Sequence, residues 1–259
     1  MVELSGYSLL SIFLLSSIVI LSATEIGRRI GVRRAASGGD HIATLESAIL
    51  SLLALMIGFT FAMALSRFEG RRDAVLNEAN AIGTTALRAR MLPAPHNAQA
   101  VKLLREYVQV RLDITRRVPS VAELNDAIAR SNALQEALWG EAQAAAAKDA
   151  GMVPTGIFIQ TLNEMIDNQE KRLTAGRNRV PNIVLLALYG IAIVAGAFTG
   201  YGSGLEAGRS RLPVYLTGIL VSSVILLIQD LDRPNTGFIT VSQQPMVDTA
   251  AGIAAYADR

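Results

Sequence analysis

Four long stretches without a charged side chain constrain this chain more than any other feature. They are mostly apolar and occupy residues 4–24, 47–66, 180–205 and 212–229. An α-helix needs about 20 such residues to cross the hydrocarbon core of a bilayer. The sequence therefore predicts an all-α, polytopic membrane protein with four transmembrane helices.

The composition excludes several other classes of protein. The chain has no cysteine, which rules out thiol catalysis, disulfide scaffolds, cysteine-ligated zinc and iron–sulfur clusters. Its two histidines, His41 and His96, stand apart in polar, loop-like contexts, and no phosphate-binding loop or nucleophile elbow occurs. We therefore expect no enzyme, no catalytic residues, no metal site and no cofactor. A net charge of only +2 does not indicate a nucleic-acid partner.

The stretches divide the chain into four parts. Residues 1–66 are predicted to hold the first transmembrane helix pair, and residues 181–229 the second. Between them, residues 67–180 should form a helical extramembrane domain, and residues 230–259 a C-terminal tail. The connector 25–46 contains four arginines and Ser-Gly-Gly, which is typical of a flexible loop with a basic patch beside the membrane.

The second apolar stretch runs without a breaker into the polar middle of the chain. No proline occurs between Ser47 and Met91, so one helix of about 40 residues could cross the membrane and project beyond it. Apolar residues at helical spacing predict the buried face of its projecting part. These are Val75, Ala79, Ile82 and Ala86.

The rest of the middle domain is also expected to be helical. A second apolar stripe predicts a further amphipathic helix; it comprises Val101, Leu104, Val108 and Leu112. Ser120 with Glu123 matches a capping box at the start of the next helix. A last helix should run from about Ile157 to Thr174.

Four spans place both termini and the middle domain on one side of the membrane. Lys and Arg close to the spans number eight on that side and six on the other. The positive-inside rule then predicts a multi-pass protein of the plasma (inner) membrane, with the middle domain and both termini in the cytoplasm. The first helix by itself favours the reverse, because only its C-terminal side carries arginine.

Small residues repeat every four positions in the third stretch and form one ridge of a helix. They are Ala192, Gly196, Gly200 and Gly204. Such ridges let two helices approach closely within lipid. The ridge could form a subunit interface or pore wall, or it could serve packing inside one four-helix bundle. We favour the packing interpretation.

Several motifs indicate a family. Gly58-Phe59 followed by Arg67-Phe68 resembles the second transmembrane helix of bestrophin anion channels. Three further motifs, at residues 78–84 (EANAIGT), 230–234 (DLDRP) and 241–245 (VSQQP), strengthen a narrower match. Together they resemble the bestrophin-like domain family, mostly bacterial membrane proteins of unestablished function. This resemblance covers nearly the whole chain, and its link to true bestrophins is remote.

The remote link implies a homo-oligomeric, pentameric anion pore with a cytosolic helical domain. Aligning on Gly58-Phe59 places the bestrophin neck at Ser51, Leu55 and Phe59, which share one helix face. Leu55 and Phe59 suit an apolar constriction that gates by dewetting. Ser51 departs from the bulky apolar pattern. No acidic run matches the bestrophin calcium clasp, so calcium gating is not implied.

Two alternatives remain open at this level. The chain could be a non-conducting, membrane-anchored scaffold or sensor whose helical domain binds a partner. In that case Leu55 and Phe59 would be ordinary lipid-facing or packing residues. A small-solute transporter is disfavoured, because the spans lack the broken helices expected around a binding site at the membrane midplane. The expected partners are the lipid bilayer, further copies of the chain and, for a channel, inorganic anions.

Overall fold

The computed structural model describes residues 8–35, 43–115, 120–148, 153–206, 210–234 and 236–256. Within these ranges it contains eight α-helices and no strand, which confirms the all-α fold class. The chain divides into two compact units. The membrane unit comprises Met1–Phe68 with Arg179–Thr240, and the polar unit comprises Glu69–Asn178 with Val241–Arg259.

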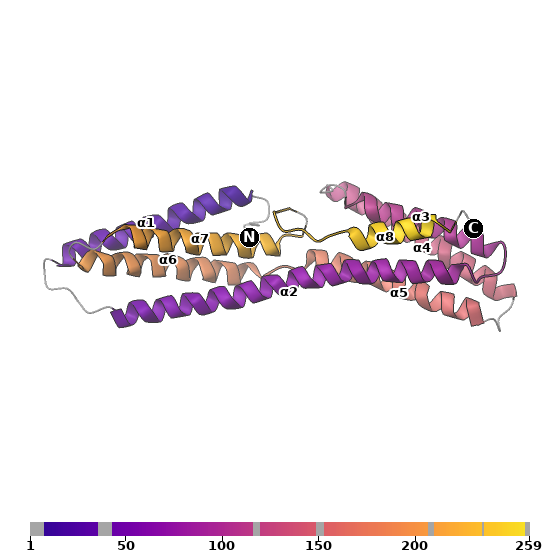
Figure 1. Ribbon diagram of the computed structural model, residues 1–259, viewed down its shortest axis with the longest axis horizontal. Helices are drawn as coiled ribbons and strands as arrows, with labels where there is room; N and C mark the ends of the chain where they lie inside the picture. Colours follow the sequence, from indigo (N-terminus) through magenta and orange to yellow (C-terminus); the bar gives the residue numbers. More distant parts are fainter. Residues whose placement is uncertain are drawn as a thin grey trace. The chain divides into compact units, whose positions relative to one another are not determined.

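The membrane unit is built from α1 (Leu9–Ala35), the first part of α2 (Ala43–Ala89), α6 (Asn182–Leu205) and α7 (Leu212–Asp232), shown in Figure 1. In the part of the chain that the structure describes, four helical segments are long and apolar enough to cross a membrane, as the sequence predicts. Their shared core contains fully or almost fully buried apolar side chains from all four helices: Ile20, Leu53, Leu188 and Ile225.

The prediction of a flexible connector over residues 25–46 is wrong for most of this segment. Helix α1 continues to Ala35, and α2 already begins at Ala43. Glu25 explains part of this, because it accepts hydrogen bonds from Arg28 at 2.9 Å and from Arg29 at 2.7 Å. Ion pairs at these spacings stabilise a helix. Residues 36–42, with His41, lie outside the described part of the chain.

The polar unit combines the second part of α2 with α3 (His96–Asp113), α4 (Val121–Lys148), α5 (Val153–Arg177) and α8 (Gln244–Ala254). Its core side chains come from every one of these helices: Ile82, Leu104, Leu138, Leu162 and Met246 are fully buried. The C-terminal segment is thus divided, since residues up to Thr240 belong to the membrane unit and α8 belongs to the polar unit.

Several local predictions are confirmed. Helix α2 is continuous over 47 residues, and its predicted stripe from Val75 to Ala86 is buried. The capping box forms, with the Glu123 amide donating to the Ser120 hydroxyl at 3.2 Å and the Ser120 amide donating to Glu123 at 2.8 Å. His96 differs from its expected loop context: it begins α3, is buried, and lies 2.7 Å from the Glu141 carboxylate.

Candidate functional site

The three residues predicted for a pore neck share one exposed face of α2. Leu55 is 54% exposed and Phe59 is 64% exposed, and Ser51 is also exposed. The opposite face is buried in the membrane unit, where Leu53 is 4% exposed and Ala64 is fully covered. The single chain therefore presents the candidate residues outward and leaves their face uncovered.

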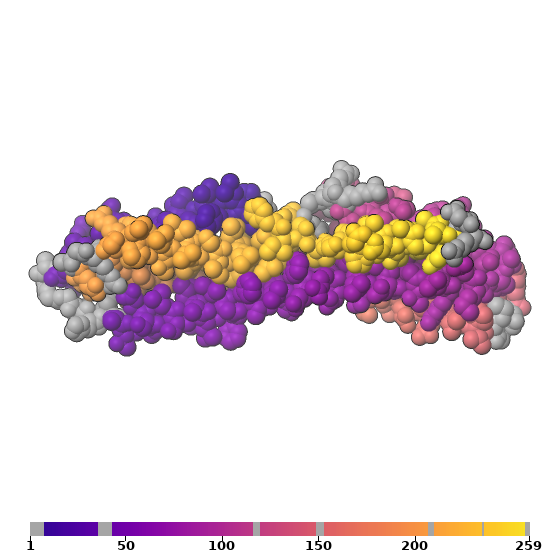
Figure 2. All heavy atoms as spheres, viewed as in Figure 1, coloured from indigo at the N-terminus to yellow at the C-terminus, as the bar shows by residue number. Residues whose placement is uncertain are grey.

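This uncovered face extends along the charge-free part of α2. A side chain added at Gly58 would meet nothing within 4 Å. Ala62 and Ser66 continue the exposed positions at four-residue steps from Gly58. Figure 2 shows the spheres of α2 uncovered along this part of the membrane unit. In a bilayer, such a face meets lipid, a second copy of the chain, or water enclosed by several copies.

Two acidic residues follow on α2 at the same helical spacing. Glu69 lies three residues after Ser66, Asp73 lies four residues further, and both are exposed. The Asp73 carboxylate is 3.7 Å from the guanidinium of Arg72, and both side chains are more than half exposed. We did not predict these two residues as candidates, although the continuing spacing in the sequence was a signal for them.

The small-residue ridge of α6 faces α1 inside the membrane unit. A Cβ atom added to Gly196 would lie 2.9 Å from the Thr24 hydroxyl oxygen. One added to Gly200 would overlap the Thr24 carbonyl, and one added to Gly204 would overlap that of Arg28. Ala192 lies on the same ridge and is buried. The two helix backbones are therefore in direct contact along this ridge.

Helix α1 contributes two glycines of its own to this contact. A Cβ atom at Gly27 would overlap the carbonyl of Ala197, and one at Gly31 would overlap that of Tyr201. These residues were missed because they lie in the connector that we expected to be a loop. Their four-residue spacing was the available signal.

A family model describes most of the chain. The Bestrophin-like domain matches residues 13–246. The chain belongs to the Bestrophin-like family. No curated protein matches its sequence.

Solved structures of bacterial bestrophin homologues share the fold. A point mutant of a Klebsiella pneumoniae bestrophin homologue matches with a TM-score of 0.73 at 15% identity, covering 95% of this chain and 99% of that chain. A structure of a bestrophin homologue from the same organism, phased on zinc, matches with a TM-score of 0.69 at 17% identity, covering 96% and 98%. The match extends over both units, and at this identity it concerns the fold alone.

The bestrophin-like motif at 78–84 places its acidic residue at the centre of a buried network in the polar unit. Glu78 is fully buried and accepts hydrogen bonds from Arg111 and Arg172, each at 2.6 Å. Arg172 also donates to the side chain of Gln243, in the motif at 241–245, at 2.9 Å. Two of the family motifs therefore meet in one network.

Tyr107 links this network to amide side chains on α4 and α5. Its hydroxyl donates to Gln169 at 2.8 Å, and the Gln135 amide donates to Gln169 at 3.1 Å. Burial, and next the nearby Glu78 carboxylate, raise the pKa of Tyr107 well above its ordinary value. The phenol therefore stays neutral at physiological pH. We did not predict these partners, because they come from four helices that are distant in sequence.

The third family motif, at 230–234, organises the segment after α7. The Asp230 carboxylate accepts hydrogen bonds from the backbone amides of Phe238 at 2.9 Å and Ile239 at 3.1 Å. Asp232 accepts one from the Val180 amide at 2.8 Å, just before α6. Both carboxylates thus bind backbone groups of the membrane unit.

Proposed function

We propose that this bestrophin-like protein is a homo-oligomeric ion channel whose pore is lined by α2. The observation that carries the proposal is the uncovered face with Ser51, Leu55 and Phe59, on a helix of bestrophin-like fold. A large aromatic and a large aliphatic side chain, both more than half exposed in the described part of their unit, suit contacts that several copies make around a common axis.

The proposed gate follows from the chemistry of this face. Leu55 and Phe59 lie about one helical turn apart. Around an axis, each would form an apolar ring, and narrow apolar rings exclude water and oppose the passage of ions. Ser51 lies one turn before Leu55. Its side chain is polar, but its hydroxyl already donates a hydrogen bond to the Ser47 carbonyl at 2.8 Å.

The permeant ions are the finer part of the proposal. The resemblance to bestrophins implies inorganic anions. Glu69 and Asp73 favour cations as a second candidate, because rings of acidic side chains attract cations in channels. Reversal potentials under a salt gradient distinguish permeant anions from permeant cations. If Glu69 and Asp73 select cations, the double variant Glu69→Gln, Asp73→Asn should shift the reversal potential toward the equilibrium potential of the anion.

The assembly and orientation complete the proposal. Family resemblance suggests five copies, and the count of basic residues suggests the inner membrane with the polar unit and both termini in the cytoplasm. Since the chain has no native cysteine, a single cysteine at Ser120 reports its own side of the membrane. We expect it to be protected from an impermeant thiol reagent in intact spheroplasts. Labelling of this cysteine in intact spheroplasts would show that the polar unit lies on the opposite side of the membrane.

Halide and alkali-cation flux into proteoliposomes tests conduction. We expect flux from the wild type and greater flux from Phe59→Ala and Leu55→Ala, because a smaller side chain widens and wets an apolar constriction. Leu220→Ala is the matched control, since Leu220 is as exposed as Phe59, at 64%, but lies on α7. Background flux from folded, oligomeric samples of all variants would support the competing scaffold or sensor instead.

A further inference from the structure

The network around Glu78 contains more positive than negative charge. The side chains of Glu78 and Arg111 are 0% and 1% exposed, and that of Arg172 is 12% exposed. The two guanidinium groups share a single carboxylate. Tyr107 supplies no compensating charge because it stays protonated, and the remaining partners are neutral amides. Among the described residues, the bonded network therefore holds one more positive than negative charge, largely shielded from solvent.

Two buried polar atoms, one in this network and one a helical turn from Gln135, have no partner among the described residues. Arg111 Nη1 and the Ser131 hydroxyl are shielded from solvent, and neither has a hydrogen bond to any residue that the structure describes. Both residues are fully buried. An arginine in a protein does not lose its proton, and a buried donor without an acceptor is costly. This position therefore calls for an acceptor that the described protein atoms do not provide.

The register of α3 and α4 places Arg111 and Ser131 at one level along the two helices. His96 near the start of α3 contacts Glu141 late in α4, and Tyr107 contacts Gln135 earlier in α4, so the helices are antiparallel. Arg111 is one helical turn after Tyr107, and Ser131 is one turn before Gln135. The two side chains thus occupy matching positions on facing helices.

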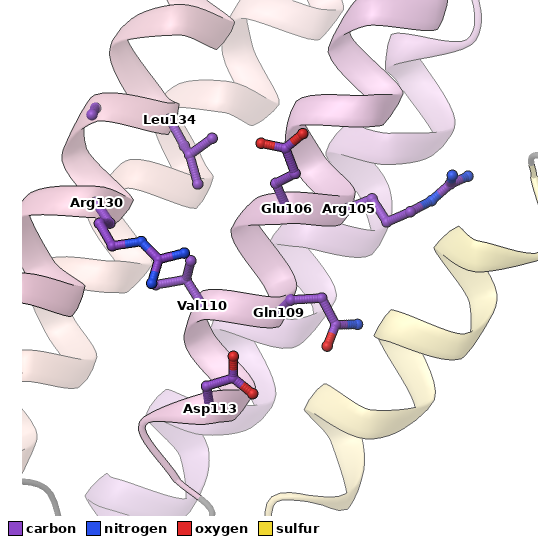
Figure 3. A pocket seen from close by; sticks show the side chains of 8 residues that line it. Arg105, Glu106, Gln109, Val110, Asp113, Arg130 and Leu134 are labelled. Atoms are coloured by element: carbon purple, nitrogen blue, oxygen red, sulfur yellow. The ribbon is translucent and has the colours of Figure 1, made fainter.

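A groove of about 640 Å³ opens beside this level. Its lining includes the neighbours of the two residues along the chain, Val110 and Asp113 on α3 and Arg130 on α4. Figure 3 shows the Arg130 side chain reaching from α4 toward α3. The groove also contains Glu106 and Arg105, so its own charges balance. It brings solvent next to the position where the excess charge is buried.

We propose that a monatomic anion of the halide class binds inside the polar unit, between α3 and α4, with Arg111 Nη1 and the Ser131 hydroxyl as its ligands. Such an anion accepts hydrogen bonds from both orphan donors and also neutralises the buried charge. A water molecule would satisfy the donors but leave the charge. The site is independent of the proposed pore, since every residue in it belongs to the polar unit.

Thermal unfolding of the full-length protein in detergent tests the site. Sodium bromide is titrated against sodium gluconate at constant ionic strength, because gluconate is too large to bind between packed helices. A ligand that binds only the folded state raises Tm in a saturable way. We expect bromide to raise Tm and gluconate to leave it unchanged. An equal change in Tm with bromide and with gluconate would overturn the proposal.

Ser131→Ala is the decisive variant, because it removes one ligand and little volume. The bromide concentration that gives half of the maximal rise in Tm should increase roughly tenfold, because one hydrogen bond to a charged group, the ion, is lost. Thr155→Ala is the matched control: Thr155 also has a buried hydroxyl without a described partner, but lies at the start of α5. An unchanged response in Ser131→Ala would exclude this site.

Anomalous diffraction from crystals grown in bromide gives the direct measurement. We expect one anomalous peak between Arg111 and Ser131 in the wild type and its loss in Ser131→Ala. Density at that position without an anomalous signal would identify a water molecule and contradict the proposal.

Discussion

The two units of this protein hold their helices together in different ways. In the membrane unit, α1 and α6 meet through glycines, and backbone carbonyls occupy the space that side chains would fill. In the polar unit, helices meet through large apolar side chains and through the buried network of Glu78. The difference follows from the solvent. The hydrophobic effect does not drive helices together in lipid, so close van der Waals packing must stabilise their contact. In water, burial of large apolar side chains stabilises it.

The largest effect should come from removing the carboxylate at the centre of the polar unit. Glu78→Gln leaves the buried guanidinium groups of Arg111 and Arg172 without their counter-charge. We expect a loss of about 3–5 kcal/mol in the free energy of unfolding, typical of breaking a buried ion pair. Denaturant unfolding measures it, and Glu170→Gln on the exposed side of α5 is the control. Equal stability of the two variants would contradict a structural role for the network.

The next effect should come from the glycine contact in the membrane unit. Gly200→Leu places a side chain where the Thr24 carbonyl lies. Overpacking of this kind typically costs about 1–3 kcal/mol, and more where the backbone must move. Gly190→Leu is the control on the same helix, since a Cβ atom there would meet nothing within 4 Å. Thermal stability in detergent should fall for Gly200→Leu alone.

Gly196→Leu tests the ridge one turn earlier, where the added Cβ atom would lie 2.9 Å from the Thr24 hydroxyl oxygen. This neighbour is a side chain that can rotate, so we expect a smaller loss than at Gly200. The same thermal measurement orders the two variants. Greater damage at Gly196 would show that the backbone contact at Gly200 is not the tighter one.

The smallest effect concerns Tyr107 and depends on pH. Its pKa is raised in the folded protein, so the folded state keeps a proton that the unfolded state loses above about pH 10. Stability should therefore be complete below that pH and decline as the pH rises. Tyr107→Phe should cost about 1 kcal/mol at neutral pH and flatten the alkaline decline. Unfolding midpoints between pH 8 and 11 test this, and parallel curves for both proteins would refute it.

Features that depend on residues close together in the sequence were predicted, and features that depend on contacts between distant segments were not. The four spans, the long α2 and the Ser120–Glu123 cap follow from local composition and spacing, and all three appear in the structure. The connector was mispredicted because four arginines and the Ser37-Gly38-Gly39 sequence suggested a loop, although most of the segment is helical. Gly27 and Gly31 in the same segment serve a helix contact, and that contact depends on α6, which is far away in sequence.

The candidate site shows the same limit. Helical spacing alone was enough to place Ser51, Leu55 and Phe59 on one face, but their role as a pore lining stays a prediction. The network around Glu78 could not be assembled from spacing, because Arg111, Gln135 and Arg172 come from three further helices. The family motif marked Glu78, yet it did not indicate that its partners outnumber it in charge.

The backbone contact between α1 and α6 also limits which motions are available to the membrane unit. Sliding one helix along the other would drive the carbonyls of Thr24 and Arg28 into the backbone of the neighbouring turn. We therefore expect the pair to move as one body, because a contact between backbones has no side-chain rotamers that could absorb a displacement. If α2 lines a pore as proposed, a change of pore diameter would have to come from displacement of α2 against this pair, with which it shares a core of apolar side chains.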